Sequence, residues 1–213
     1  MSELPMFIDK KSECKALLFD LGGVIYHIDP ELTAKLFQKK IGDNYFQFLT
    51  TAEKEDIFNK FEIGEVSSEY FLTRLSEISE GKLTKDDVFS IWNKMIVNIP
   101  TQHLVSLKRL SLEKPIYLLS NTNSIHVDFI NRQLKNIGMY DLYHQVFTKI
   151  YYSHQIKVRK PNKEAFEYVL NDCGLKPQEI CFLDDKQENI DSAKKAKIDS
   201  FLFPFNGDLT KWI

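Results

Sequence analysis

The chain has 213 residues, of which 43% are hydrophobic and 27% are charged. This length and composition are typical of a globular protein with one α/β domain and a modest insertion, or with two small domains. Lys and Arg total 28 against 30 Asp and Glu, so the chain lacks the basic excess of a nucleic-acid-binding protein. No apolar run approaches the ~20 residues of a membrane span. We therefore expect neither nucleic acid nor a membrane as a partner.

The N-terminal segment and the cysteines indicate a cellular compartment. Residues 1–14 have no basic start followed by an apolar run, so they are not a signal peptide, and we expect a loosely held leader there. Cys14, Cys173 and Cys181 are widely spaced and odd in number, which indicates neither a zinc site nor a disulfide framework. A reducing compartment, the cytoplasm, fits this pattern best.

Short apolar runs predict the strands of a parallel sheet. Runs that are apolar throughout, rather than alternating, suit strands buried on both faces. Four such runs lie at residues 16–19, 116–119, 180–183 and 200–203, and residues 145–147 form a weaker fifth. Helical segments separate the later strands, at residues 124–137, 163–173 and 190–197. This βαβ order predicts a doubly wound α/β fold.

The stretch between the first two strands is too long for a single crossover and carries several helix starts. Pro30 lies at the first turn of one helix, and Ser67 caps another, which Gly81 ends. Thr84 and Asp87 have the spacing of a capping box. We therefore expect several helices between the first strand and the second.

These helices predict the division of the chain into domains. Residues 29–97 would form a helical cap, and residues 1–28 and 98–213 would form the α/β core. An insertion after the first strand of such a sheet lies above the carboxyl ends of the strands, where ligands bind.

Polar residues follow the predicted strands at their carboxyl ends. Asp20 follows the first strand, Ser120 and Asn121 follow the second, and Asp184 and Asp185 follow the strand at 180–183. In a parallel sheet these ends converge on one crevice. Carboxylates are ligands for magnesium, hydrogen-bond donors can hold phosphoryl oxygens, and an aspartate held in line can attack phosphorus.

Four motifs, FDLGGV, SNT, RKP and LDDxxxN, occur in this order. In order and spacing they resemble the four motifs of the haloacid dehalogenase superfamily, and the match covers residues 15–205. The helical insertion resembles that superfamily's first type of cap. Within the superfamily the chain most resembles small phosphatases that act on sugar phosphates such as glucose 1-phosphate. The resemblance implies a Rossmann-like core and a magnesium-dependent phosphohydrolase that acts through an aspartyl phosphate on a small phosphorylated metabolite.

The resemblance implies a magnesium site and its surroundings. Asp20 would be both the nucleophile and a metal ligand. The backbone carbonyl of Gly22 and the carboxylate of Asp185 would be the other protein ligands. Asp184 and Asn189 would support these ligands from behind.

It also implies a phosphate site. Ser120 and the N–H of Asn121 would hold the oxygens of the transferring phosphoryl group, and Lys160 would neutralise both the nucleophile and the phosphate. Each group has an ordinary structural alternative. Ser120 and Asn121 could cap the following helix, and Lys160 could lie at a solvated helix start. Adjacent carboxylates at 184 and 185 could form a solvated turn, but they repel each other unless a cation offsets them.

Gly22 is the main departure from the resemblance. Most phosphatases of this superfamily have a second Asp there, which protonates the leaving oxygen and later activates water. Such general acid–base catalysis is typically worth about 100–10,000-fold. Without it, we expect hydrolysis to favour acidic leaving groups, such as those of a sugar 1-phosphate or an acyl phosphate.

Other polar residues lie near the expected site. His27 could donate a proton in place of the missing acid, or it could be a packed or exposed histidine. Glu62 and Glu65 flank Gly64 in a turn between cap helices, where relatives place a substrate-facing loop. They could hydrogen-bond a sugar or be solvated turn charges. The basic cluster of Lys157, Arg159 and Lys160 could hold a single phosphate.

Two other functions compete with the phosphatase. A dehalogenase of the same fold needs no proton for its halide leaving group, but it also needs no magnesium, and it carries a D-x-Y-G-T start rather than D-L-G-G. A non-catalytic module that binds a phosphorylated ligand is the second, and the presence of Asp20, Lys160 and Asp185 argues against it. The sequence indicates neither the natural substrate nor the oligomeric state.

Overall fold

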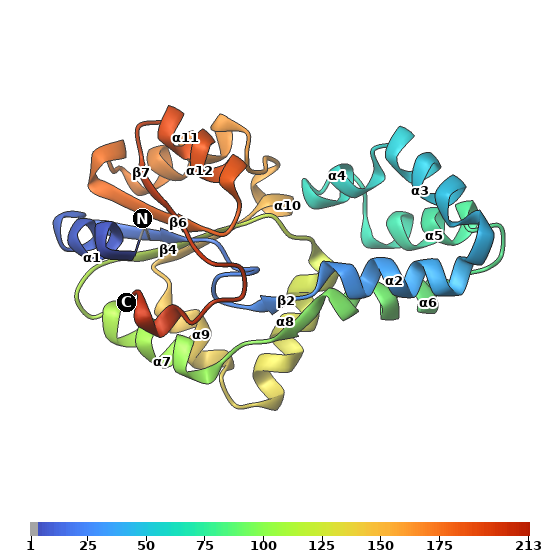
Figure 1. Ribbon diagram of the computed structural model, residues 1–213, viewed down its shortest axis with the longest axis horizontal. Coiled ribbons are helices and arrows are strands. Elements are labelled where there is room, and N and C mark those ends of the chain that lie inside the picture. Colours follow the sequence, from blue (N-terminus) through green and yellow to red (C-terminus); the bar gives the residue numbers. More distant parts are fainter. Residues whose placement is uncertain (1–3) are drawn as a thin grey trace.

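The computed structural model describes residues 4–213, and its centre is a parallel sheet (Figure 1). The strands are β1 (Ala16–Phe19), β4 (Ile116–Ser120), β5 (Lys149–Tyr152), β6 (Ile180–Asp184) and β7 (Asp199–Leu202). They lie in the order β5-β4-β1-β6-β7, and each neighbouring pair is parallel. The chain therefore builds the sheet outward from β1 in both directions, which confirms the doubly wound α/β fold.

Helices cover both faces of this sheet, which is why its strands are apolar throughout. In β1, Leu17 and Phe19 belong to one hydrophobic cluster, and Ala16 and Leu18 belong to another on the opposite face. Figure 1 shows the helices on the two sides. On one side lie α7 (Thr101–Leu110), α8 (Ser124–Asn136) and α9 (Tyr140–Val146), and on the other lie α11 (Lys163–Cys173) and α12 (Gln187–Lys195).

The weaker fifth strand expected at residues 145–147 is wrong. Residues 145 and 146 end α9, and the edge strand is β5, a few residues later. Its first residue, Lys149, is exposed. β5 lies at one edge of the sheet and its start is not covered, so its sequence lacks the continuous apolar run found in β1, β4 and β6.

The expectation of a loosely held leader is also wrong for the part of it that the structure describes. Residues Leu4–Glu13 form helix α1, and residues 1–3 lie outside the described residues. The ring of Phe7 is fully buried and lies 5.4 Å from that of Phe201 and 5.7 Å from that of Trp212. These partners come from the other end of the chain, so local sequence could not reveal the contact.

The cysteines differ from the expectation as well. Cys14 and Cys181 form a disulfide, with their Cα atoms 6.1 Å apart, and Cys173 is free. They are 167 residues apart in sequence. The pairing of β1 with β6 places Leu17 opposite Cys181, which brings the start of β1 close to it. A cytoplasmic location stays a prediction, and the cysteine pattern no longer supports it.

The insertion between β1 and β4 consists mainly of helices that pack on one another, to the right of the sheet in Figure 1. The helices are α2 (Pro30–Ile41), α3 (Tyr45–Lys54), α4 (Ile57–Glu62), α5 (Ser68–Ile78) and α6 (Lys85–Trp92). Their apolar faces form a third hydrophobic cluster, which includes Phe37, Phe71 and Trp92. The division into a cap at 29–97 and a core stays a prediction.

The helix starts in this insertion lie where the sequence predicts them. Pro30 opens α2, and Ser67 caps α5 by accepting a hydrogen bond from the N–H of Tyr70 at 3.1 Å. Thr84 and Asp87 form the capping box of α6. The predicted end at Gly81 is slightly late, because α5 ends at Ile78.

Short elements complete the fold. The strands β2 (His27–Ile28) and β3 (Ile96–Asn98) pair antiparallel where the chain enters and leaves the insertion. The remaining segments are α10 (Ser153–Ile156), η1 (Gly42–Asn44), η2 (Asn93–Met95), η3 (Pro177–Glu179) and η4 (Leu209–Lys211). None of the helices formed by residues 4–213 combines the length and the apolar character that a membrane span requires.

Candidate active site

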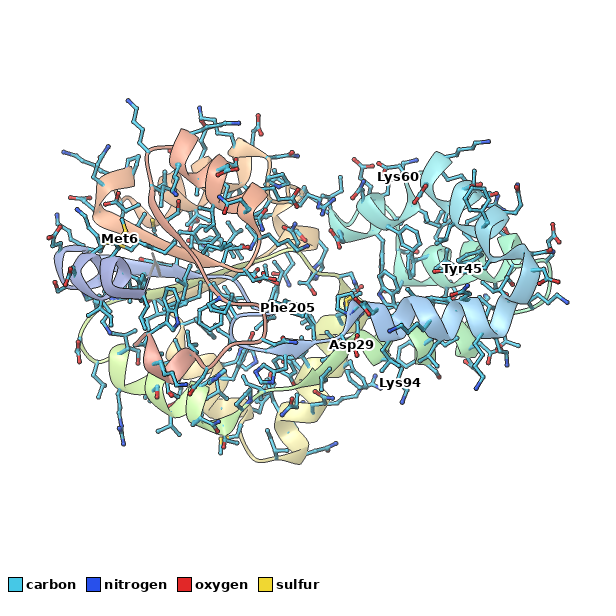
Figure 2. The ribbon with its side chains drawn as sticks, in the orientation of Figure 1. Met6, Asp29, Tyr45, Lys60, Lys94 and Phe205 are labelled. Atoms are coloured by element: carbon cyan, nitrogen blue, oxygen red, sulfur yellow. A yellow bond between two sulfur atoms is a disulfide. The ribbon has the colours of Figure 1, made fainter. Side chains whose placement is uncertain are left out.

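A cavity of about 220 Å³ is lined by residues from all four predicted motifs. Of the predicted site residues, Ser120 and Asp184 are not part of its lining. The cavity opens at the carboxyl ends of β1, β4 and β6 and is also lined by residues of the insertion. Its lining residues are Asp20, Gly22, Ile28, Pro30, Glu62, Met95, Asn121, Arg159, Lys160, Asp185, Lys186, Asn189 and Phe205. Figure 2 shows Phe205 and Asp29 where the sheet meets the insertion.

Lys160 is the centre of this site. It is 1% exposed, and its Nζ lies 2.5 Å from Asp20 Oδ1 and 2.6 Å from Asp184 Oδ2. Burial alone would lower the pKa of Lys160, but the two carboxylates raise it, so the side chain is a cation. The interpretation of Lys160 as part of a solvated helix start is therefore wrong, and the helix that follows begins at Lys163 after Asn162.

The side chain of Asn121 holds Lys160 in place, a role that the sequence did not reveal. Asn121 Oδ1 accepts a hydrogen bond from the backbone N–H of Lys160 at 2.9 Å, and Asn121 Nδ2 donates to its carbonyl at 2.7 Å. The two motifs are 39 residues apart and meet only because β4 and the segment before α11 lie side by side. The alternative that Ser120 or Asn121 caps α8 is wrong, since Asn123 does so.

Asp184 and Asn189 support the site from behind. Besides the contact with Lys160, Asp184 accepts hydrogen bonds from Asn189 Nδ2 at 2.9 and 3.0 Å and from the backbone N–H of Lys186 at 2.8 Å. Asp184 is fully buried. Its oxygens are thus occupied by donors, whereas the neighbouring carboxylate of Asp185 lines the cavity.

Three carboxylates gather here in a way that suits a divalent cation. Oxygens of Asp20, Asp184 and Asp185 lie within 4.8 Å of one another. Burial raises the pKa of Asp20 to about 7, helped by Asp184 and Asp185 and opposed by Lys160. Burial and the charge of Asp184 raise the pKa of Asp185 to about 6. A cation would relieve this repulsion, and carboxylate oxygens are the ligands that magnesium prefers.

Gly23 allows one of these carboxylates to come close. Its φ is +84°, and a Cβ built on it would lie 2.7 Å from Asp185 Oδ2 and 2.9 Å from Asp185 Cγ. Any other residue would collide with Asp185, and with Cδ2 of Phe205 at 2.9 Å, so one of them would have to move. The second glycine of the DLGG motif therefore shapes the carboxylate cluster.

Ser120 lies beside the main cavity. It is 3% exposed and lines a smaller cavity of about 50 Å³, which shares Gly22, Ile28, Met95 and Asn121 with the larger one. The structure thus brings Ser120 next to the cavity that holds Asp20 and Lys160, at the end of β4.

An apolar side chain lies against Gly22. The φ of Gly22 is not in the left-handed region, so a larger residue meets no backbone restriction there. A Cβ at this position would lie 3.1 Å from Cδ1 of Ile28. Asn206 fixes Ile28: its Oδ1 accepts from the N–H of Ile28 at 3.0 Å, and its Nδ2 donates to the carbonyl at 2.9 Å. The C-terminal segment thereby shapes the site, which no local motif indicated.

Of the three residues that could replace the missing acid, His27, Glu62 and Glu65, only Glu62 lines the cavity. His27 is not among the residues that line the cavity, and its ring packs 5.8 Å from that of His103. Glu65 is exposed and lies outside the cavity lining, whereas Glu62 is part of it.

The basic cluster does not form a single phosphate site. Lys160 contacts Asp20 and Asp184, Arg159 Nε lies 3.0 Å from Glu62 Oε2, and Lys157 Nζ donates to the carbonyl of Gly64 at 2.6 Å. Two of the three cations therefore hold the insertion against the core.

Residues 14–197 match the family described as haloacid dehalogenase-like hydrolase, and the chain belongs to that family. The expectation of an enzyme of the hydrolase class is thereby confirmed. Among curated proteins, a D-ribitol-5-phosphate phosphatase from Bacteroides thetaiotaomicron is 27% identical over 198 residues, which cover 91% of this chain and 93% of that protein. A sesquiterpene phosphatase from Aspergillus oryzae is 25% identical over 84% of this chain and 85% of its own length.

Solved structures agree with this assignment. A HAD family enzyme from Bacteroides thetaiotaomicron, crystallised as a magnesium complex, is 31% identical with a TM-score of 0.81, over 92% of this chain and 96% of that one. A predicted HAD-like hydrolase from Porphyromonas gingivalis is 27% identical with a TM-score of 0.79, over 92% of this chain and 93% of that one. A dehalogenase, 16% identical with a TM-score of 0.57, over 88% of this chain and 83% of that one, shares the fold.

Proposed function

We propose that this protein is a magnesium-dependent phosphatase that uses Asp20 as a covalent nucleophile on a small phosphorylated metabolite. The observation that carries the proposal is the buried Lys160, which contacts both Asp20 and Asp184 beside the carboxylate of Asp185. A cation held between a nucleophile and an acidic metal site neutralises a phosphoryl group as it is transferred. The phosphatase names of two relatives and the magnesium complex of a structural neighbour support it.

The residues divide into a metal side and a phosphate side. Asp20, Asp185 and the carbonyl of Gly22 would hold the magnesium ion, which when bound neutralises charge on the phosphoryl oxygens. On the other side, Ser120 and the N–H of Asn121 would donate to those oxygens. Asp20, whose repulsion by the neighbouring carboxylates the bound cation would relieve, would attack phosphorus. Lys160 would balance the charge of the aspartyl phosphate that forms.

The size of the cavity supports a small molecule as the substrate. Its volume of about 220 Å³ suits a monophosphate of a sugar or polyol rather than a nucleic acid or a protein side chain in a folded domain. The helices of the insertion would act as a cap of the first type and would contribute Pro30 and Glu62 to the lining. A sugar 1-phosphate and D-ribitol 5-phosphate, the latter from the name of a relative, are the first substrates to test.

A panel assay tests the proposal. Phosphate release from sugar and polyol phosphates, measured with magnesium and with excess chelator, should appear only with magnesium and only with Asp20 intact. Chloride release from 2-chloropropionate without added metal would instead identify a dehalogenase. Saturable binding of a phosphorylated metabolite without any turnover would identify a non-catalytic module.

A further inference from the structure

The cavity holds one carboxyl group that the proposed metal site does not use. Among the described residues that line it, the acids are Asp20, Glu62 and Asp185. Asp20 and Asp185 belong to the carboxylate cluster, while Glu62 comes from the end of α4 in the insertion. Position 22, where most phosphatases of this superfamily carry an acid, is a glycine with Ile28 packed against it.

We propose that Glu62 is the general acid and general base of this site, in place of the carboxyl group missing at position 22. The inference rests on the phosphatase function proposed above. It assigns the proton transfers to the insertion, while the core retains the nucleophile and the metal site.

The backbone of Glu62 is fixed to the core. Ser153 Oγ lies 2.6 Å from the carbonyl of Glu62, to which it donates, and it accepts a hydrogen bond from the N–H of Thr122 at 2.9 Å. Thr122 lies two residues beyond Ser120, at the end of β4. Lys157 Nζ adds a second tie by donating to the carbonyl of Gly64 at 2.6 Å. These contacts hold the turn after α4 close to the end of β4, which carries Ser120 and Asn121.

The side chain of Glu62 is 27% exposed and lines the cavity, and its carboxyl group has spare hydrogen-bonding capacity. Its Oε2 lies 3.0 Å from Arg159 Nε, yet the two are not aligned for a hydrogen bond, and among the described residues Oε2 has no hydrogen-bond partner. Since Oε2 is enclosed against Arg159, a substrate oxygen or a water in the cavity would reach Oε1, the other carboxyl oxygen of this partly exposed side chain. The guanidinium of Arg159 keeps the group oriented.

Burial and the nearby cations act on the pKa of Glu62 in opposite directions. Burial raises its pKa above the ordinary value, and the charges of Arg159, Lys186 and Lys160 counter part of that rise. Other titratable groups on the elements around it are the N-cap Asp56 and Lys60 of α4, Glu65 of the turn, and His154 and Lys157 of the segment that holds the turn. Burial favours the acid form of this carboxyl and the nearby cations favour its base form, which suits a group that must give up a proton and take one back in each cycle.

Glu62 would give up one proton and take one back within each turnover. In the first step a carboxylate oxygen of Asp20 bonds to phosphorus, the bond from phosphorus to the leaving oxygen breaks, and that oxygen takes the proton of Glu62. In the second step the Glu62 carboxylate takes a proton from water as the water oxygen bonds to phosphorus. The bond to Asp20 then breaks, which releases phosphate and restores both carboxyl groups.

Glu62→Gln tests the proposal, because glutamine keeps the shape but cannot carry the proton. p-Nitrophenyl phosphate needs no acid for its first step, since p-nitrophenolate leaves unaided. The variant should therefore release about one equivalent of p-nitrophenol in a burst and then turn over about 100-fold more slowly or worse, because water is no longer activated. With ribitol 5-phosphate it should be slowed at least as much and show no burst of ribitol.

The matched control is Glu65→Gln, which alters an exposed carboxyl three residues away and should behave as the parent protein does. Adding Gly22→Asp with Ile28→Ala to Glu62→Gln should restore part of the turnover by returning an acid to its usual position.

If Glu62→Gln raised only the KM for ribitol 5-phosphate, without a burst or a fall in kcat, Glu62 would bind a hydroxyl group and the proposal would be wrong. Parent-like kinetics in Glu62→Gln would equally overturn it. Absence of phosphate release by the parent and by Glu65→Gln alike would refute the phosphatase function itself.

Discussion

Cδ1 of Ile28 lies 3.1 Å from the place that a Cβ on Gly22 would occupy. The obstacle to an acid at this position is therefore a packed side chain and not the backbone angle, which is outside the left-handed region. Because Asn206 holds the backbone of Ile28 at both its N–H and its carbonyl, the strand cannot easily move aside.

Gly22→Asp alone should destabilise the protein, since overpacking typically costs about 1–3 kcal/mol. Combining it with Ile28→Ala removes the close contact, so the two changes together should cost less than the sum of the single changes by about 1 kcal/mol. Urea unfolding of the parent, the two single variants and the double variant measures this coupling. Strictly additive free energies would show that Ile28 does not exclude the aspartate.

The rate of hydrolysis should depend less steeply on the acidity of the leaving group than the glycine at position 22 alone suggests. If Glu62 supplies the proton, kcat/KM of the parent should fall only modestly from acyl and anomeric phosphates to primary-alcohol phosphates. In Glu62→Gln the same series should become steep, because each leaving oxygen must then depart without a proton. A series of phosphates of graded leaving-group acidity measures both slopes, and a steep slope in the parent would contradict the role of Glu62.

Asp20→Asn should abolish turnover and leave the fold intact. The change is nearly isosteric, and Lys160 keeps its contact with Asp184 at 2.6 Å, so its charge remains paired. We expect kcat below about 1% of the parent value, from loss of the nucleophile. Circular dichroism and thermal unfolding check the fold. More than a few per cent of residual activity in the purified variant would exclude the covalent role.

Magnesium should be required for turnover and should stabilise the protein. Chelator should stop phosphate release, magnesium should restore it, and calcium should restore it poorly because its coordination shell is larger and looser. A ligand present at about 100 times its Kd stabilises the folded state by about 2.7 kcal/mol, so magnesium should raise Tm by several degrees. Asp185→Asn should lose this rise. Full activity in excess chelator would speak for metal-free chemistry.

Acid should loosen the junction between the insertion and the core through His126. This ring stacks on Trp92 at 5.2 Å, its Nε2 donates to the Trp92 carbonyl at 3.0 Å, and Asn123 Nδ2 donates to its Nδ1 at 3.2 Å. Burial lowers the pKa of His126 from 6.5 to about 4. The unfolded chain therefore binds the proton first, and stability that is present above pH 6.5 is lost as the pH falls toward 4.

Between pH 7.5 and pH 4.5, protonation of His126 should lower the free energy of unfolding by roughly 2–3 kcal/mol. His126→Gln should be less stable than the parent at pH 7.5 but should lose correspondingly less on acidification. His144→Gln, which alters an exposed histidine whose pKa burial also lowers, is the comparison and should reduce the acid loss less than His126→Gln does. Urea unfolding at the two pH values measures the difference. If the parent and His126→Gln lost the same amount of stability on acidification, His126 would not be the group responsible.

Local sequence determined much of the fold. Continuous apolar runs gave the positions of β1, β4 and β6, because strands covered on both faces need apolar residues at every position. Caps at Ser67 and Thr84 marked helix starts, since their side chains bond to the free N–H groups of the first turn. The same logic placed Asp20, Asp184 and Asp185 together, as the carboxyl ends of parallel strands meet at one edge.

Tertiary structure decided the features that depend on partners distant in the chain. Phe7 packs on Trp212, Cys14 bonds to Cys181, and Asn121 holds Lys160. No local pattern encodes such contacts, because each depends on which surfaces the completed sheet brings together. The two most informative relationships in the site are of this kind. Ile28 fills the space beside Gly22, and the turn after α4 places Glu62 in the cavity of Asp20, because both positions are set by packing of the insertion and the C-terminal segment against the core.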